Sequence, residues 1–146
     1  MRFDGAAREG RSFYRGYMSK LDFIATDKAP AAVGPYSQAV RAGGFLYVSG
    51  QLGLAPATGQ FAGADFEAQA KQALANMGAI LAEAGCAVTD IVSVDVFVTD
   101  LANFKLFNGI YDEFMAGHRP ARAAVQVSGL PLGGVVELKC VALARQ

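Results

Sequence analysis

Hydrophobic positions repeat along the chain with two different periods, and the changes of period divide it into elements. Residues 35–50 (PYSQAVRAGGFLYVSG) contain two short apolar runs separated by Ala42-Gly43-Gly44. Paired glycines supply the positive φ of a tight turn, so this segment predicts a β-hairpin. Residues 54–63 (LAPATGQFAG) then predict a loop, because Pro56 and Gly59 interrupt both periods.

A helical period begins near Asp65 and ends at Gly85. The carboxylate of Asp65 can cap free N–H groups at the start of a helix, and glycine commonly follows the end of one. Apolar residues recur here at spacings of three, four and seven, which predicts one buried stripe. Its members are Phe66, Ala70, Ala73, Leu74, Met77, Ile80, Leu81 and Ala84.

The second half of the chain contains three predicted strands and a second helix. Residues 91–98 (IVSVDVFV) alternate, with Val92, Val94, Val96 and Val98 expected on one face of a strand. Residues 123–127 and 135–144 predict two further strands, joined through Pro131 and Gly133-Gly134. Between residues 98 and 123, a second helix is predicted, and Asn103 is expected to cap it. The residues expected on its inner face are Phe104, Phe107, Asn108, Tyr111 and Phe114.

The predicted order is β-β-α-β-α-β-β, which indicates an α+β subunit. Two helices can cover only one face of such a sheet. The other face is too apolar to lie against water, so we expect the protein to form an oligomer. Active groups at strand ends on that uncovered side would then meet between subunits.

Composition strengthens the prediction of an oligomer and excludes some functions. The chain has 146 residues, enough for one domain, and 53% of them are hydrophobic. The 13 basic and 13 acidic residues give a net charge of zero, which argues against a nucleic-acid partner. No apolar run approaches the ~20 residues that span a bilayer, so we expect a soluble protein that does not bind membranes.

The two cysteines suggest a reducing compartment. Cys86, Cys140 and the single histidine fit no zinc-binding spacing, so no metal site is predicted. Buried, reduced thiols are the simplest expectation for such cysteines, and they favour the cytoplasm.

The N-terminal segment differs in character from the rest of the chain. Residues 1–17 have no helical apolar spacing, and Met18 opens a segment that resembles a natural start. We therefore expect an N-terminal extension over residues 1–17 and a single domain over residues 18–146. A mitochondrial location would follow if the extension were a natural signal, although its acidic residues are unusual for one.

Three polar residues, Arg122, Asn108 and Glu137, interrupt these patterns, and each has an ordinary structural explanation. Arg122 enters a strand, where a surface arginine is common. Asn108 lies among aromatic residues, where a hydrogen-bonded core amide is common. Glu137 alternates with Lys139 and could form a cross-strand ion pair of little energy. Gly50, in the strand-ending segment VSGQ, would let a ligand approach the backbone.

Four segments of the chain, taken together, resemble the RidA (YjgF-type) imine deaminases. The matching segments are KAPAAVGPYSQAV, YVSGQLG, AKQALANMGAILAEAG and RPARAAVQVSGLP…VVEL, in this order, within residues 26–143. The resemblance implies a chorismate-mutase-like subunit and a homotrimer with its sheets packed inward and three clefts between neighbours. It also implies hydrolysis of reactive 2-imino acids to 2-keto acids and ammonia, without cofactor or metal. Such imines are released by pyridoxal-phosphate enzymes.

The resemblance assigns roles to particular residues of this chain. Arg122 matches the arginine that binds the substrate carboxylate, and a planar guanidinium suits that task. Glu137 matches the glutamate that positions or activates the attacking water. The other matching pocket residues are Tyr36, Ser49, Gly50, Asn108 and Ala124.

Two departures from the family pattern affect the expected chemistry. Some members have a cysteine where this chain has Ala124, so only backbone groups could contact a ligand there. Lys139 replaces a second acid found in many members, and on a strand it would share a face with Glu137 and could lower the pKa of that carboxyl. Arg119 is expected to add charge at the mouth of the cleft.

The sequence is also compatible with two other functions. Lys139 is compatible with a binding or chaperone-like protein that holds a keto acid without converting it. An endoribonuclease is the second alternative, and the zero net charge argues against it.

Overall fold

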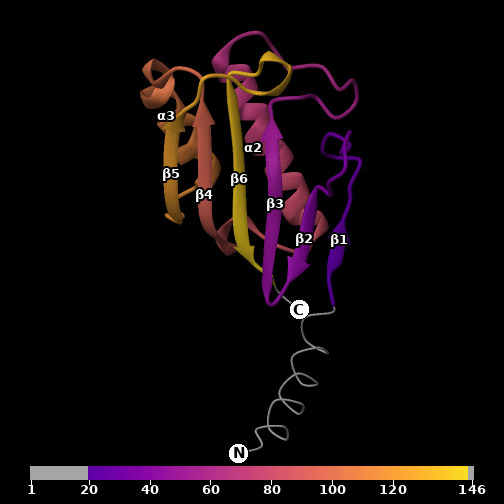
Figure 1. The fold of residues 1–146 in the computed structure, drawn as a ribbon. Coiled ribbons are helices and arrows are strands. Elements are labelled where there is room, and N and C mark those ends of the chain that lie inside the picture. The colour runs from indigo at the N-terminus through magenta and orange to yellow at the C-terminus, as the bar shows by residue number, and fades with distance from the viewer. Residues whose placement is uncertain (1–19, 145–146) are drawn as a thin grey trace, which may run out of the picture.

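The computed structural model describes residues 20–144, in which two helices pack against one face of a six-stranded sheet (Figure 1). The predicted extension over residues 1–17 lies outside the described residues. The helices are α2 (Phe66–Glu83) and α3 (Phe104–Met115). The strands are β1 (Asp22–Ile24), β2 (Ala39–Ala42), β3 (Phe45–Leu52), β4 (Ile91–Val98), β5 (Ala121–Gln126) and β6 (Val136–Leu143).

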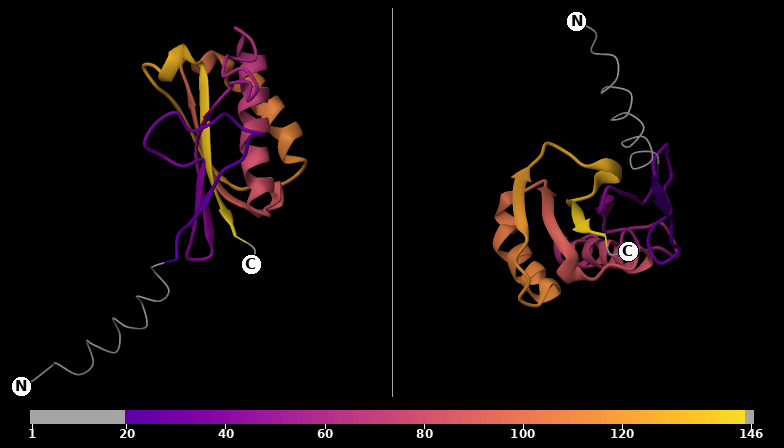
Figure 2. Two further views of the ribbon diagram at one scale, coloured as in Figure 1. Left: turned by 90° about the vertical axis from the view of Figure 1, so that its right-hand side faces the viewer. Right: turned by 90° about the horizontal axis from the view of Figure 1, so that it is seen from below.

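The sheet has the strand order β1-β2-β3-β6-β4-β5. All neighbouring strands are antiparallel except β4 and β5, which are parallel and are connected through α3. Seen edge-on, both helices lie on the same side of the sheet, and no helix of the described chain covers the other side (Figure 2). This arrangement confirms the predicted α+β class.

The covered face contains the hydrophobic core. Every residue of the stripe predicted for the first helix is buried, and so are Val94, Val96 and Val98 of β4. Asp65 caps α2 as expected, because its side chain accepts a hydrogen bond from the Ala68 N–H. No helix among residues 20–144 is long and apolar enough to cross a membrane.

Three details differ from the sequence-based expectations. The strand β1 was not predicted; it is three residues long, and only Ile24 contributes to the core. Val92 is exposed and does not share the buried face of β4, because the ladder with β6 shifts register between Ile91 and Ser93. Asn103 makes no side-chain cap for α3, whereas Asp100 accepts a hydrogen bond from the Ala102 N–H in the preceding 3-10 turn.

Candidate active site

Arg122 lies on the edge strand β5, on the helix-covered side of the sheet. Its neighbour across the parallel ladder is Val94, which is fully buried, so the two side chains project to the same face. The guanidinium carbon lies 4.8 Å from the centre of the Tyr111 ring and 5.4 Å from that of Phe104. Both distances are within the range of cation–π attraction.

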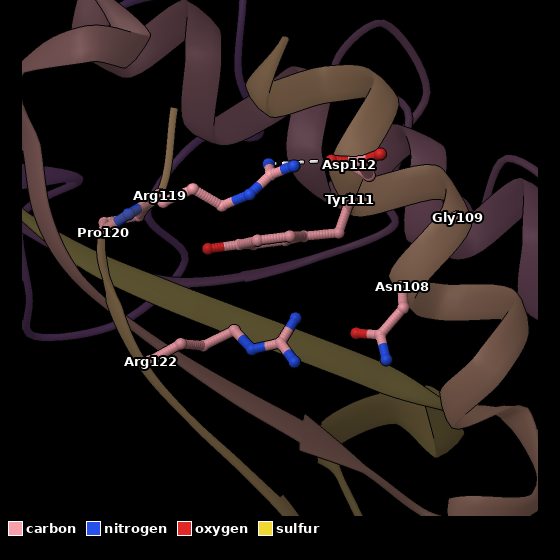
Figure 3. Close-up of a pocket in the computed structure, with 7 residues that line it drawn as sticks. All are labelled: Asn108, Gly109, Tyr111, Asp112, Arg119, Pro120 and Arg122. Atoms are coloured by element: carbon pink, nitrogen blue, oxygen red, sulfur yellow. Dashed lines mark ion pairs between the residues drawn. The ribbon is translucent and has the colours of Figure 1, made fainter. Parts of the chain in front are cut away.

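An open cleft of about 480 Å³ is formed in front of Arg122 by α3 and the segment that enters β5 (Figure 3). This volume is in the range that small-molecule sites use. The residues that line it are Asn108, Gly109, Tyr111, Asp112, Arg119, Pro120 and Arg122.

The two arginines of the cleft differ in their partners. Arg119 forms an ion pair with Asp112 at 2.7 Å, so much of its charge is already compensated at the mouth of the cleft. Arg122 forms no ion pair with any acid of residues 20–144. A permanently charged group without an acidic partner, at the wall of a cleft, is suited to bind an anion.

Asn108 extends from α3 toward the Arg122 guanidinium (Figure 3). It lies one helical turn from both Phe104 and Tyr111, and the three residues therefore share one face of the helix. Asn108 is half-buried and lines the cleft, and it makes no side-chain hydrogen bond within the described chain. These features differ from those of a hydrogen-bonded core amide.

Ala124 projects to the same face as Arg122, because its ladder partner is the buried Val96. Its methyl group packs against the hydrophobic core. The side chain therefore offers no chemistry to a ligand.

Glu137 lies on the central strand β6, on the opposite face of the sheet. Its ladder partners are Leu52 of β3 and Phe97 of β4, whereas the adjacent Leu138 is buried beneath the helices. Burial raises the pKa of the Glu137 carboxyl above its usual value. A raised pKa makes a carboxylate a stronger base.

Gly50 provides the space that the Glu137 side chain occupies. A Cβ atom placed on Gly50 would lie 2.0 Å from the Glu137 carboxylate oxygen Oε1. Only glycine at this position lets the carboxyl group rest on the backbone of β3, where the β3–β6 ladder changes register between Val48 and Gln51.

The expected effect of Lys139 on Glu137 is wrong. The ammonium group of Lys139 lies 4.0 Å from the carboxylate of Asp95, directly across the β4–β6 ladder. Glu137 makes no ion pair with it, and the pKa of Glu137 is raised by burial and not lowered by the lysine. The Glu137–Lys139 ion pair considered from the sequence is likewise absent from the described residues.

Ser49 joins the loop before β2 to the same strand end. Its hydroxyl donates a hydrogen bond to the Ser37 carbonyl at 2.5 Å, and its backbone N–H donates one to the Gln38 carbonyl. These bonds hold Tyr36, the residue before Ser37, close to this end of the sheet, and 51% of Tyr36 is exposed.

The predicted site residues thus form two groups within one chain. Arg122, Asn108 and Ala124 lie on the helix side of the sheet, while Glu137 contacts Gly50 beside Ser49, with Tyr36 in the adjoining loop. The sequence did not identify Phe104 and Tyr111 as contacts of Arg122. Their spacing of four and three residues around Asn108 was the available signal.

Comparison with known proteins identifies the family of this chain. Residues 26–144 match the family model described as Endoribonuclease L-PSP. A Bos taurus protein named 2-iminobutanoate/2-iminopropanoate deaminase is 48% identical over 120 residues, which cover 82% of this chain and 88% of that protein.

Two solved structures show the same fold. RidA from the Antarctic bacterium Psychrobacter sp. is 47% identical with a TM-score of 0.81, covering 84% of this chain and 98% of that one. Escherichia coli TdcF with bound serine is 39% identical with a TM-score of 0.81, covering 86% and 99%. The chain is a member of the endoribonuclease L-PSP family, to which the RidA and YjgF proteins also belong.

Proposed function

We propose that this protein hydrolyses reactive 2-imino acids, of the 2-iminobutanoate and 2-iminopropanoate type, to 2-keto acids and ammonia. The observation that carries the proposal is the Arg122 guanidinium, which faces a cleft and has no acidic partner in residues 20–144. The name of the Bos taurus relative and the serine held by Escherichia coli TdcF both support a substrate derived from an amino acid.

Arg122 binds the substrate carboxylate in this proposal. A guanidinium offers two parallel N–H donors that match the two carboxylate oxygens, so it fixes the position of the adjoining C=N carbon. Asn108 extends toward the same point and can donate or accept a hydrogen bond at the substrate (Figure 3).

Glu137 activates the attacking water. Its carboxylate removes a proton from water as the oxygen bonds to the C=N carbon, and this addition gives a tetrahedral aminol. Transfer of a proton to the nitrogen then lets the C–N bond break, so the products are one keto acid and one ammonia. The raised pKa of Glu137 supports its role as the base.

One subunit cannot place both groups on one substrate, because Arg122 and Glu137 project from opposite faces of its sheet. We infer that each site combines Arg122 and Asn108 of one subunit with Glu137, Tyr36, Ser49 and Gly50 of another. A homotrimer packed through its open sheet faces is the assembly we propose. Because Cys86 and Cys140 are free and buried, we also propose a reducing location, such as the cytoplasm.

Imine hydrolysis and keto-acid binding test the proposal together. The imine is generated by a pyridoxal-phosphate dehydratase and its decay is followed by the release of ammonia, while pyruvate binding is measured by calorimetry. Arg122→Ala should weaken binding by roughly 2–5 kcal/mol, about 30- to several thousand-fold, and abolish hydrolysis. Arg122→Lys should recover only part of this loss, because an ammonium is a point donor.

Arg119→Ala is the control. Because the charge of Arg119 is already paired with Asp112, its removal should weaken pyruvate binding and imine hydrolysis far less. Unchanged pyruvate affinity in Arg122→Ala would refute the assigned role of this arginine. Pyruvate binding without any acceleration of imine decay would favour the keto-acid-binding alternative.

A further inference from the structure

Within residues 20–144, Arg122 has no partner of the kind that usually fixes the orientation of an arginine. A long side chain has many rotamers, and a carboxylate commonly selects one of them through two parallel hydrogen bonds. No acid of the described chain does this for Arg122. A bidentate grip on a substrate carboxylate nevertheless requires the plane of the guanidinium to be set in advance.

Two aromatic rings of α3 lie beside the guanidinium instead. Phe104 and Tyr111 are seven residues apart, or two helical turns, and their rings lie 5.4 and 4.8 Å from the guanidinium carbon. The faces of aromatic rings attract cations and stack on planar guanidinium groups. The helix therefore presents a surface that can hold Arg122 without neutralising it.

The Tyr111 ring is itself fixed by the core. It packs on Phe107 with ring centres 5.6 Å apart, and Phe107 packs edge-to-face on Phe66 of α2 at 6.3 Å. Phe107 is completely buried, and only 8% of Tyr111 is exposed. A line of three packed, buried aromatic rings thus runs from the N-terminal turn of α2 to the guanidinium.

The ring of Tyr111, and not its hydroxyl, makes the contact with Arg122. The hydroxyl is buried and has no hydrogen-bond partner within residues 20–144. In Figure 3 it points away from Asn108, and Arg119 and Arg122 extend along opposite sides of the ring. Because Asp112 pairs with Arg119, Arg122 is the cation beside this ring that no acid of the described residues compensates.

We propose that Tyr111 is a positioning residue, whose ring, together with that of Phe104, holds the Arg122 guanidinium in the orientation that binds the substrate carboxylate. The aromatic rings take the place of an acid that would compete with the substrate for the same N–H donors. This role rests on the proposed function of Arg122, but the contact itself can be tested without any substrate.

Nuclear magnetic resonance of protein labelled with ¹⁵N at arginine tests the contact. The Nε–Hε signal of Arg122 is identified by its loss in Arg122→Lys. A proton held over the Tyr111 face should resonate upfield of the exposed arginines in the wild-type protein. The shift should persist in Tyr111→Phe and disappear in Tyr111→Leu. An unshifted Arg122 signal in the wild-type protein would overturn the proposal, whether or not the Tyr111 variants fold.

Pyruvate titration and imine hydrolysis test the consequence. Tyr111→Leu should raise the Kd of pyruvate and the KM of the imine about 3- to 30-fold, the range of a partly desolvated cation–π contact. Tyr111→Phe keeps the ring and should stay within about twofold of the wild-type values. In the Arg122→Lys background the effect of Tyr111→Leu should shrink, because the planar group is gone.

Phe114→Leu is the matched control. Phe114 is a half-buried aromatic residue of the same helix that lies between α2 and α3, away from the cleft. It should leave the Arg122 signal, the Kd and the KM unchanged. Equal effects of Phe114→Leu and Tyr111→Leu would mean that general loosening of α3 is responsible, and would overturn the proposal. If the wild-type protein neither binds pyruvate nor hydrolyses imines, the proposed function fails instead, and the resonance experiment still decides the contact.

Discussion

At the scale of single residues, Glu137 is an acid that the fold keeps partly out of water. Burial raises its pKa, so in the folded protein its charged form is less favourable than in the unfolded chain. The folded state then binds a proton more tightly than the unfolded state does. Above the raised pKa, where the carboxylate is charged in both states, this group lowers the stability of the fold.

Glu137→Gln separates the role of the carboxyl group as a base from its effect on the stability of the fold. We expect imine hydrolysis to fall about 10²- to 10⁴-fold because the base is lost. Stability at neutral pH should stay equal or rise, because a half-buried charge is removed. In the wild-type protein, activity should decline as pH falls through the raised pKa, above the 4.5 of an ordinary glutamate. The pH dependence of the rate measures the catalytic effect, and urea titration measures the change in stability. Unchanged turnover in the variant would mean that another group activates the water.

Gly50→Ala tests whether the position of Glu137 depends on the missing side chain beneath it. The new methyl group would occupy the place of Oε1, and the end of a flexible side chain can move away. We therefore expect kcat to fall while the folded structure is retained. Gly129→Ala, in the loop after β5, adds a methyl group to open space and should leave kcat unchanged. Equal rates in both variants would show that Glu137 needs no such support.

At the scale of elements, the end of β3 is locked to α2 through Gly53. A Cβ on Gly53 would lie 2.4 Å from the Gln69 carbonyl oxygen and 2.5 Å from its Cα, so backbone meets backbone here. The Gln69 side chain extends this junction, because it donates to the Gly63 carbonyl and accepts from the Val135 N–H before β6.

Gly53→Ala should therefore destabilise the protein by about 1–3 kcal/mol, as overpacking in a core does. Gly109→Ala is the opposite case, since this exposed position of α3 has free space around it. It should stabilise the protein by about 0.5–1 kcal/mol through helix propensity. Chemical denaturation measures both, and a neutral Gly53→Ala would mean that the β3–α2 junction can separate without cost.

The elements that the sequence predicted well are those with a local cause. Gly43 and Gly44 both have positive φ and form the two-residue hairpin turn, and the apolar stripe of α2 is buried as expected. The strand β1 was not predicted because the contacts that stabilise it come from residues far away in the sequence. It pairs with β2, and Asp22 forms an ion pair with Arg41. The exposure of Val92 depends on a register shift against β6, which no local pattern contains.

The same limit applies to the candidate site. Sequence patterns identified Arg122, Asn108 and Glu137 as residues that interrupt the hydrophobic order. The partner of Lys139 could not be predicted, because Asp95 comes from a strand 44 positions earlier that pairs with β6 only in the folded sheet. The placement of Arg122 and Glu137 on opposite faces of the sheet likewise depends on how β4, β5 and β6 pair in the folded structure.

At the scale of the whole molecule, the open face of the sheet carries large apolar side chains. Phe45, Tyr47, Val125 and Leu143 are all exposed there. Tyr47→Asp places a charge in the middle of this face and should convert the proposed trimer to smaller species with loss of activity. Leu106→Asp, at an exposed position of α3, should leave the assembly intact. Sedimentation measures both, and a wild-type monomer at micromolar concentration would refute the assembly.

The placement of Arg122 and Glu137 on opposite faces of one sheet has a genetic consequence. If each site takes one group from each of two neighbours, a cell with one gene copy for Arg122→Ala and one for Glu137→Gln makes mixed trimers. Each mixed trimer regains a single site with both wild-type groups. Two alleles that are inactive alone should then complement each other, whereas the double variant on one allele beside a null allele should not.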